Sequence, residues 1–472
     1  MSISNALANA LSGLLVSSKR AELVSANVAN VMTEGFARRE LNVEATNPAG
    51  ASVTSVSRVV NEQTITDRRM ADADLAHSNT LLAFHTKVES LIGTPLDDHS
   101  LSARFADFEA ALDMAISRPD LENRLQAVSI SADRIASKFN NVSDAIQEMR
   151  RNADAEAAKL VSTLSENLDR VAELNRLIIA ADVNNHDAAA LFDQRQTVID
   201  EIAEIVPVRV ARRDHGEVAL FSHGGAILLD GAPAELAFSN TPLVTAHMSQ
   251  ENELLSEVMY RGRPAGESLS GGALEAVFKI RDELAPKIQN ELDKAALDLS
   301  LRFQDPNVDH TLGPSQAALF TDEDARVSEM NVVGLSGRLK VSAFVSRDGA
   351  FDVWKLRDGL GALSSGEPGQ NALLSAMKSA LRIDRVAGTA SLASVFDLAA
   401  GLETNAASNR IQQEKTQGFA SAKHTQLKEI ELSYGVDTDA EMQNLLVIEQ
   451  AYAANARVVQ TLDELMETLL RM

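Results

Sequence analysis

Apolar residues at both ends of the chain recur at alternating steps of three and four, which constrains the fold more than any other feature. The C-terminal seam consists of Leu445, Ile448, Tyr452, the polar Asn455, Val459, Leu462, Met466 and Leu469. The N-terminal seam consists of Ile3, Leu7, Ala10, Leu14, Ser17, Ala21, Val24, Val28 and Val31. This spacing is the a/d pattern of a coiled coil. We therefore predict that the two terminal helices pair. The rest of the chain would then leave this pair after the first helix and return to it at the last helix.

The position of these seams at the chain ends favours assembly. Apolar residues at helical spacing are usually core, and we interpret residues 70–200 in that way. At its two ends, in contrast, a globular chain usually has least to bury. An isolated helix is marginal in water because most helix stability comes from packing. The terminal segments are therefore expected to fray in a free monomer and to become ordered on association.

Charge and composition exclude several classes of function. The 472 residues have a net charge of −23, which disfavours sequence-independent binding of nucleic acid. The chain has no cysteine, which excludes disulfides, thiolate metal sites and thiol nucleophiles. No apolar run approaches the roughly 18 residues that suggest a membrane span, and the N-terminus lacks the basic region of a signal peptide. We expect a soluble, acidic and mostly helical protein without nucleic acid as a partner and without membrane insertion.

The periodicity predicts a mainly α fold with β-rich insertions, in the α+β class. Helices are expected over residues 2–31, from Met70 to about Ile205, over 274–299 with a kink or restart at Pro286, and from about Ala372 to the end with a break near Gly435. Further breaks are expected at Gly93–Pro95 and Arg118–Asp120. Strands are expected near 41–66 around a turn at Asn47–Gly50, within 206–271, and at Leu339–Val345 and Phe351–Leu356.

From this order we predict an elongated rod of several domains. Residues 1–45 and 430–472 form a terminal coiled-coil domain. Residues 46–205, 272–305 and 370–429 form a helical bundle, with the hairpin-like segment near 41–66. Residues 206–271 and 306–369 form β-rich outer domains at the far end of the rod.

The motifs of enzymes and metal sites are incomplete. Asp305–Asp309 starts like a calcium-binding loop, but His310 and Gln316 occupy the positions that need glycine and glutamate. His77 and His85 are eight positions apart, too far for a two-ligand helix face. We predict no catalytic, cofactor-binding or metal-binding residues, and no cofactor. A basic group at residues 209–213 is interpreted as a charged strand edge.

Two terminal motifs resemble those of the bacterial flagellar axial proteins, which include rod, hook and hook-associated proteins. The segment Asn27–Arg38 is similar to their N-terminal signature, with Phe36 where tyrosine is usual. Its signature residues here are Asn27, Asn30, Gly35, Phe36 and Arg38. The segment Gln450–Val459, followed by residues 463–465 and preceded by Gly435–Asp437, is similar to the C-terminal signature.

Interior motifs narrow the resemblance to the hook-associated protein 1 family, whose members form the first hook–filament junction. The similar motifs are Leu191–Arg195, and Gly271–Leu274 together with Arg281–Asp282. The long helical middle also resembles that family, whereas rod and hook proteins are mostly β between their termini.

The resemblance implies a structural role without enzymatic activity. It implies paired termini in an inner helical tube, helical self-assembly on the hook tip, and a platform for the second junction protein and the filament. The implied partners are the chain itself, the hook protein, the second hook-associated junction protein and a flagellar type III export chaperone. The implied location is the extracellular flagellum, reached without a cleaved signal peptide. The alternatives are a hook or rod component and an extracellular binding module that uses the β-rich domains. An enzyme would require a convergent cluster of histidines and carboxylates.

Overall fold

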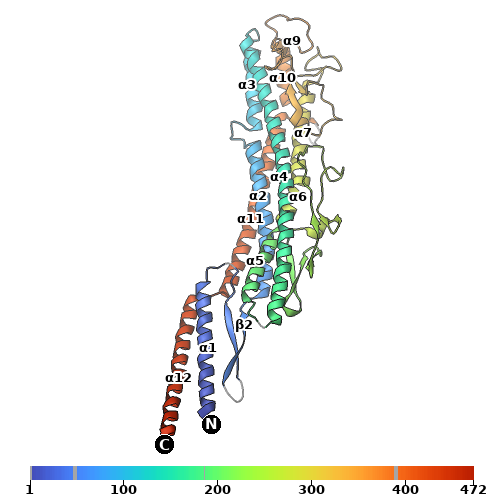
Figure 1. Ribbon diagram of the computed structural model, residues 1–472. Helices are drawn as coiled ribbons and strands as arrows, with labels where there is room; N and C mark the ends of the chain where they lie inside the picture. The colour runs from blue at the N-terminus through green and yellow to red at the C-terminus, as the bar shows by residue number, and fades with distance from the viewer. Residues whose placement is uncertain (1–2, 34, 46–49, 185, 387–391, 472) are drawn as a thin grey trace.

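The computed structural model describes residues 3–33, 35–45, 50–184, 186–386 and 392–471, and it has the shape of a long rod (Figure 1). Helices dominate and the sheets are small, so the predicted mainly α fold with β insertions is confirmed. The expected turn at residues 47–50 involves positions outside the described ranges. In the described ranges, none of the helices combines the length and the apolarity that crossing a bilayer would need.

The rod is organised around α4 (Glu122–Val183), a single helix of 62 residues. At 1.5 Å per residue it is about 93 Å long. Its buried side chains recur at steps of three and four along almost the whole helix, as in the run Leu164, Leu168, Val171, Leu174 and Ile178. Other helices therefore pack against one continuous apolar stripe of α4.

Seven further helices form the bundle with α4 (Figure 1). They are α2 (Glu62–Ile92), α3 (Leu101–Ser117), α5 (Ala189–Ile205), α6 (Gly272–Lys279), α7 (Ala285–Phe303), α10 (Ala372–Arg382) and α11 (Val395–Ser433). Side-chain caps fix three of their starts: Asn61 for α2, Ser100 for α3, and Ser394 with Asp397 as a capping box for α11. Gly93 ends α2 with a φ of 94°, as the predicted break requires.

The expected interruption near Pro286 is present. A turn of π-helix, η3 (Ile280–Leu284), separates α6 from α7, and Pro286 lies in the first turn of α7. Proline fits there because the first turn of a helix does not use its backbone N–H.

The predicted strands of 206–271 form two small antiparallel sheets. The first has the order β3-β4-β5-β6 and the second β7-β8-β9. Their bounds are β3 (Val208–Arg212), β4 (Val218–Ser222), β5 (Ile227–Asp230), β6 (Ala232–Pro233), β7 (Leu236–Ala237), β8 (Met259–Tyr260) and β9 (Arg263–Pro264). A short 3-10 turn, η1 (Asp214–Gly216), joins β3 to β4, and η2 (Gly266–Leu269) follows β9.

The position of these sheets differs from the prediction. They lie along the side of the bundle, in contact with α4, and not at the far end of the rod (Figure 1). The reason is local: β3 starts three residues after α5 ends, so the first sheet has to stay beside α5 and α4.

The strand prediction was wrong for Phe351–Leu356. That segment leads into a helical turn, α9 (Lys355–Asp358), because Val353, Leu356 and Leu360 are buried at steps of three and four. Residues 306–369 contain only two short strands among those described, β10 (Phe320–Asp322) and β11 (Leu339–Val341), and the turn α8 (Leu335–Arg338). A further pair, β12 (Arg385–Val386) and β13 (Leu392–Ala393), interrupts the helix that was expected from Ala372 to the end.

The terminal helix pair consists of α1 (Ile3–Ala29) and α12 (Thr438–Arg471). The two helices lie side by side, and both chain ends are at the same end of the rod (Figure 1). An antiparallel hairpin, β1 (Arg39–Ala45) with β2 (Ala51–Arg58), runs along α1. It ends before residue 66, and α2 starts at Glu62 instead of Met70. The division into three domains and the supercoiling of the pair stay predictions.

Candidate assembly interface

The terminal helix pair brings most residues of the two seams against each other. Those that are buried or half-buried are Ile3, Leu7, Ala10, Leu14, Ser17, Ala21, Val24 and Val28 in α1 and Leu445, Ile448, Asn455, Val459 and Leu462 in α12. The two helices that carry the seams therefore lie against each other, although they are more than 400 positions apart in the sequence.

The helices approach closely where Gly13 faces Asn455. A β-carbon placed on Gly13 would lie 2.6 Å from Nδ2 and 2.9 Å from Cγ of Asn455. Any larger residue at position 13 would therefore displace the Asn455 side chain. A polar residue at one seam position can fix the register of paired helices, at a cost in stability.

Four seam residues remain exposed. Val31 lies in the turn beyond the end of α1, while Tyr452, Met466 and Leu469 project from α12 into solvent. Tyr452 is 48% exposed and Leu469 is 58% exposed. The single partner α1 therefore does not cover the whole C-terminal seam.

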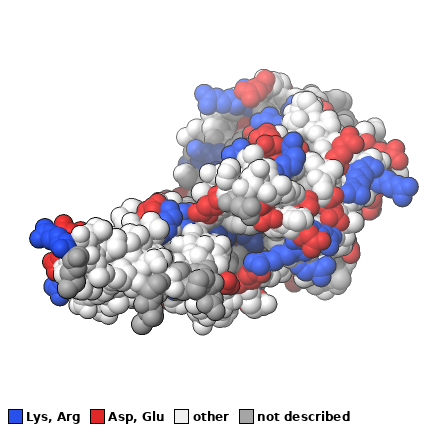
Figure 2. All heavy atoms as spheres, turned by 60° about the horizontal axis from the view of Figure 1, so that its bottom comes forward, with Lys and Arg blue, Asp and Glu red and all other residues white. Residues whose placement is uncertain are grey.

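A second apolar stripe on α12 was missed by the sequence analysis. It consists of exposed residues at steps of four, three, four and seven: Val447, Ala451, Ala454, Val458 and Leu465. Glu449 and Arg457 are the only charged residues between Met442 and Leu462. On the face that Figure 2 shows, the arm that carries α1 and α12 is mostly uncharged along its length and has charged side chains gathered near its tip, whereas charges are spread over the bundle. A helix that is apolar on more than one face is normally buried on more than one side.

The signature residue Asn27 connects α1 to two other segments. It is buried; its Nδ2 donates to the Arg39 carbonyl oxygen at 3.0 Å, and its Oδ1 accepts from the Arg39 N–H at 3.0 Å. Nδ2 also lies 3.3 Å from Oε1 of Glu441, the buried carboxylate of α12. Nη1 of Arg38 lies 3.7 Å from the same carboxylate oxygen. Asn27 therefore fixes both the start of β1 and the start of α12.

The other signature residues shape the turn after α1. Asn30 donates to the Ala26 carbonyl oxygen at 2.9 Å. Gly35 has a φ of 76° and lies against Thr197 of α5, so a side chain there would be strained. The guanidinium of Arg39 lies 4.9 Å above the Phe36 ring. These residues position the hairpin against the bundle and are not part of the seams.

Asp193, in the motif Leu191–Arg195, holds the hairpin to the bundle. Its Oδ1 accepts from Arg58 Nε at 2.8 Å and from the Ala37 N–H at 3.3 Å, and its Oδ2 accepts from Arg39 Nη2 at 3.0 Å. One carboxylate on α5 thus binds the turn after α1 and both strands of the hairpin.

A second ionic group lies where α11 passes α2 and α5. Arg68 pairs with Asp72, Asp200 and Glu431, and Nη2 of Arg68 is 2.7 Å from Asp200. Burial would lower the pKa of Arg68, but these three carboxylates raise it above its ordinary value. Burial raises the pKa of Glu431 despite the pairing with Arg68. These paired charges connect the part of α11 that leads to α12 with the bundle.

Asp305 and Asp309, the carboxylates considered for calcium binding, have structural partners. Oδ1 of Asp305 accepts from the N–H of Asn307 within its own turn. The Asp309 carboxylate is buried and accepts backbone N–H groups from Thr311 and Leu360. Within the described ranges, no group of three or more histidines and carboxylates is arranged to hold a metal ion.

Comparison with known proteins identifies two matching family regions. Residues 85–311 match the family described as the flagellar hook-associated protein FlgK helical domain. Residues 433–472 match the family described as the flagellar basal body rod FlgEFG protein C-terminal. The first region covers much of the bundle and the side sheets, and the second covers α12.

Curated relatives named flagellar hook-associated protein 1 agree with these matches. Flagellar hook-associated protein 1 of Bacillus subtilis is 24% identical over 490 residues, covering 94% of this chain and 93% of the relative. The same protein of Salmonella typhimurium is 22% identical over 66% of this chain, which spans 57% of that relative. The solved flagellar hook junction protein FlgK of Burkholderia pseudomallei aligns with a TM-score of 0.44 and 19% identity, over 54% of this chain and 46% of that one. The chain is therefore similar to flagellar hook-associated protein 1 over almost its whole length, and it is a structural component of the bacterial flagellum.

Proposed function

We propose that this protein forms the hook–filament junction by helical self-assembly through its terminal helix pair. The observation that carries the proposal is the second apolar stripe of α12. It stays in solvent although α1 already covers the other side of the helix. Neighbouring copies would bury it, and an open helical array uses contacts in which one face of a subunit meets a different face of the next.

The residues proposed for the interface are those of the two seams together with the second stripe. The signature residues act indirectly, because Asn27 and Gly35 position α1, α12 and the hairpin relative to the bundle. These residues would act through packing contacts between copies of the protein, and we expect no enzymatic activity.

The proposed partners are the hook protein below the junction, the second hook-associated junction protein above it, and further copies of this chain. An export chaperone would hold the apolar C-terminal segment before secretion through the flagellar type III apparatus. The proposed location is therefore the extracellular flagellum, reached without a cleaved signal peptide.

Two other functions have less support. A rod or hook component shares the terminal signatures but not the long bundle around α4. An extracellular binding module would use the outer segments, and the exposed Met330 and Leu363 there are single residues, which are normal on a protein surface.

Electron microscopy of cells that lack the gene, with flagellin measured in the culture medium, tests the proposal. The expected result is hooks without filaments and flagellin released into the medium, both restored by the intact gene. Missing hooks would place the protein in the rod or hook instead. Normal flagella would overturn the proposed junction role.

A further inference from the structure

A cleft of about 970 Å³ lies where the hairpin meets the bundle. Its walls are β2, the first turns of α2, and the region where the end of α4 and the start of α5 face β3 and η1. Valines of β2, including Val53 and Val56, make one wall apolar. The cleft therefore offers both an apolar surface and, at its opposite wall, charged groups.

The floor of the cleft contains a buried cation without a carboxylate partner. Arg195 is 7% exposed, and its Nη1 donates to Asn175 Oδ1 at 2.8 Å and to the Gly216 carbonyl oxygen at 2.7 Å. No carboxylate of the described ranges lies within ion-pair distance of it. Burial and the neighbouring Arg58 and Arg69 lower the pKa of Arg195 to about 10, although the Glu217 carboxylate acts in the opposite direction. A buried charge of this kind is stabilised by an opposite charge.

Most arginines of the cleft are paired with carboxylates: Arg58 with Asp193, Arg69 with Asp200, Arg212 with Glu62 and Arg213 with Asp230. Five arginines line the cleft, and they are Arg58, Arg69, Arg195, Arg212 and Arg213. Three carboxylates line it, and they are Glu62, Asp182 and Asp187. Among the described residues that line the cleft, Arg195 is therefore the arginine whose charge no ion pair balances, and a carboxylate from a second copy would complement it.

A rigid acidic loop with an apolar tip lies between α2 and α3. Oδ2 of Asp97 accepts from the Thr94 N–H at 2.7 Å and from its hydroxyl at 3.0 Å, which fixes the loop from inside. Leu96 at its tip is 95% exposed, and Asp98 beside it is exposed as well. A preorganised loop loses little conformational freedom when it docks.

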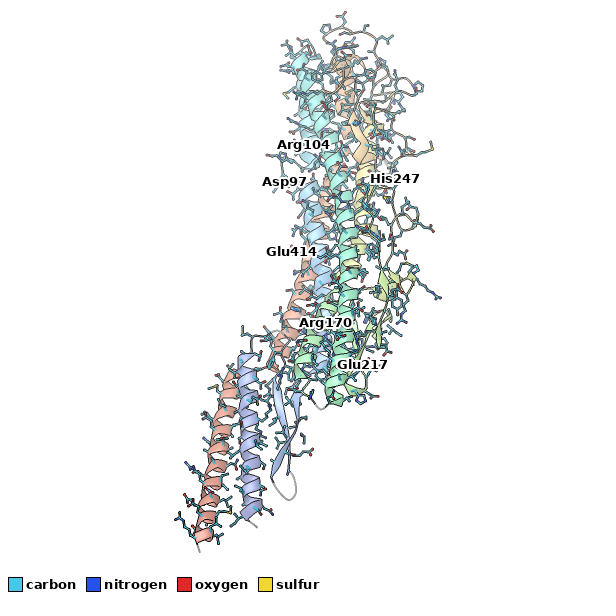
Figure 3. The ribbon with its side chains drawn as sticks, in the orientation of Figure 1. Asp97, Arg104, Arg170, Glu217, His247 and Glu414 are labelled. Atoms are coloured by element: carbon cyan, nitrogen blue, oxygen red, sulfur yellow. The ribbon has the colours of Figure 1, made fainter. Side chains whose placement is uncertain are left out.

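The loop and the cleft lie on different sides of the rod. Figure 3 places Asp97 at one edge, and Glu217, the neighbour of the cleft residue Gly216, toward the opposite edge and nearer to the terminal helix pair. Copies that stand side by side with an axial offset could therefore connect loop to cleft repeatedly, as an open array requires.

We infer that residues 94–98 of one copy dock into the cleft of a second copy, with Leu96 against the β2 valines and the Asp98 carboxylate facing Arg195 and Arg212. This inference rests on the proposed self-assembly, and it assigns to the loop and the cleft a lateral contact outside the terminal helices. The occupant of the cleft is thus a carboxylate-bearing loop of the same protein.

Engineered cysteines can test this contact directly, because the natural chain has none. Leu96→Cys and Ser55→Cys are both exposed changes, and Ser55 lines the cleft. The double variant is expressed in cells that lack the gene, and isolated flagella are treated with a mild oxidant and separated on non-reducing gels. The matched control combines Leu96→Cys with Lys415→Cys, an exposed position on α11 away from the cleft.

The expected result is a ladder of disulfide-linked multimers with the Leu96–Ser55 pair, and no ladder with the control pair or with either single cysteine. Filaments that form normally without such a ladder would overturn the loop contact while leaving the junction role intact. If the proposed junction role itself were wrong, cells that lack the gene would instead have normal flagella.

Charge reversal gives an independent readout. Asp98→Arg, in the Leu96→Cys and Ser55→Cys background, is expected to lower the cross-linked fraction at least fivefold, and Arg212→Glu added to it should restore most of that fraction. Arg212 is well exposed, so this change is not expected to disturb folding. If Asp98→Arg left the cross-linked fraction unchanged, the proposal that Asp98 lies opposite Arg195 and Arg212 would be contradicted.

Discussion

Asn27 in α1 and Glu441 in α12 are hydrogen bonded at 3.3 Å across 414 positions of sequence. Both side chains are buried, and the same amide also holds the Arg39 backbone at the start of β1. The terminal helix pair is thus attached to the hairpin through Asn27, and Ser12 of α1 adds a second bond by accepting from the Ala51 N–H at 3.1 Å. The first of these contacts gives a physical role to Asn27 of the N-terminal signature that differs from seam packing.

Asn27→Ala should loosen the terminal helix pair. It leaves the Arg39 N–H and carbonyl without their side-chain partner and leaves the Glu441 carboxylate only the more distant Arg38, and an unsatisfied buried polar group costs on the order of 1–3 kcal/mol. Limited proteolysis should then cleave the segment around residues 34–40 faster than in the natural protein. Asn30→Ala is the matched control, because Asn30 bonds only within its own helix turn. Equal cleavage of the two variants would contradict the prediction.

Leu462→Glu should separate the pair without unfolding the bundle. Leu462 is half-buried against α1, so a carboxylate there would be partly removed from water without a partner. We expect incorporation into flagella to be lost, while circular dichroism keeps most of the helical signal. Met466→Glu should act more weakly, because Met466 is 44% exposed. Loss of the whole helical signal would mean that the seam belongs to the core of the monomer. Gln460→Glu, at an exposed position, controls for added charge.

Val458→Glu should separate assembly from folding. Val458 belongs to the second stripe and is exposed in the single chain, so surface substitutions of this kind change stability by about 0.5 kcal/mol or less. In an array the same carboxylate would be buried between copies. Thermal unfolding should therefore be unchanged while complementation of a deletion strain is lost. Full motility of this variant would remove the main support for burial of the second stripe.

The helices could be predicted largely from the spacing of apolar residues and from the glycines and the proline that interrupt them. The two seams predicted that α1 and α12 lie together, and Gly93, Pro286 and Gly435 marked helix breaks that are present in the structure. The spacing of apolar residues predicts a helix well where a single buried stripe runs along its whole length. The assignment of seam residues to contacts between copies remains a prediction.

The parts that could not be predicted depend on long-range polar contacts. The start of α2 was placed eight residues late because its first turns bury Arg68 and Arg69 in ion pairs with Asp200 and Glu431, which leaves no apolar pattern to read. The role of Asp193 was invisible for the same reason: its partners Arg39 and Arg58 lie more than 130 positions away. The turn α9 was mistaken for a strand because a single turn is too short to distinguish the two periods.

Arg281→Met should destabilise the bundle strongly. Arg281 and Asp154 are fully buried, with Nη1 2.5 Å from Oδ1, and Arg281 also holds the Ser256 carbonyl oxygen. Removing one partner of a buried ion pair costs about 3–5 kcal/mol, because the other charge is left uncompensated. Urea unfolding measures the loss. Adding Asp154→Asn should recover much of it, since asparagine is neutral and can still accept from the Thr241 N–H. No recovery would mean that packing of the Arg281 stem dominates.

His85 should make the bundle sensitive to mild acid. Its ring is buried beside Phe84, and its Nδ1 has no hydrogen-bond partner. Burial, with a smaller effect from Lys279, lowers the pKa of His85 below the ordinary value of about 6.5. The unfolded chain therefore binds a proton at pH values at which the folded protein does not. The stability associated with neutral His85 is complete above about pH 6.5 and is lost as the pH falls through the folded-state pKa.

The variant His85→Gln isolates this effect. The free energy of unfolding of the natural protein, measured by urea titration between pH 7.5 and 5 at about 0.1 M salt, should fall more steeply with acid than that of His85→Gln. His247→Gln is the matched control because His247 is exposed, and its curve should parallel the natural one (Figure 3). Parallel curves for the natural protein and His85→Gln would show that His85 binds its proton equally in both states. Other acidic groups contribute to the total slope, but they are common to all three proteins and cancel in the difference.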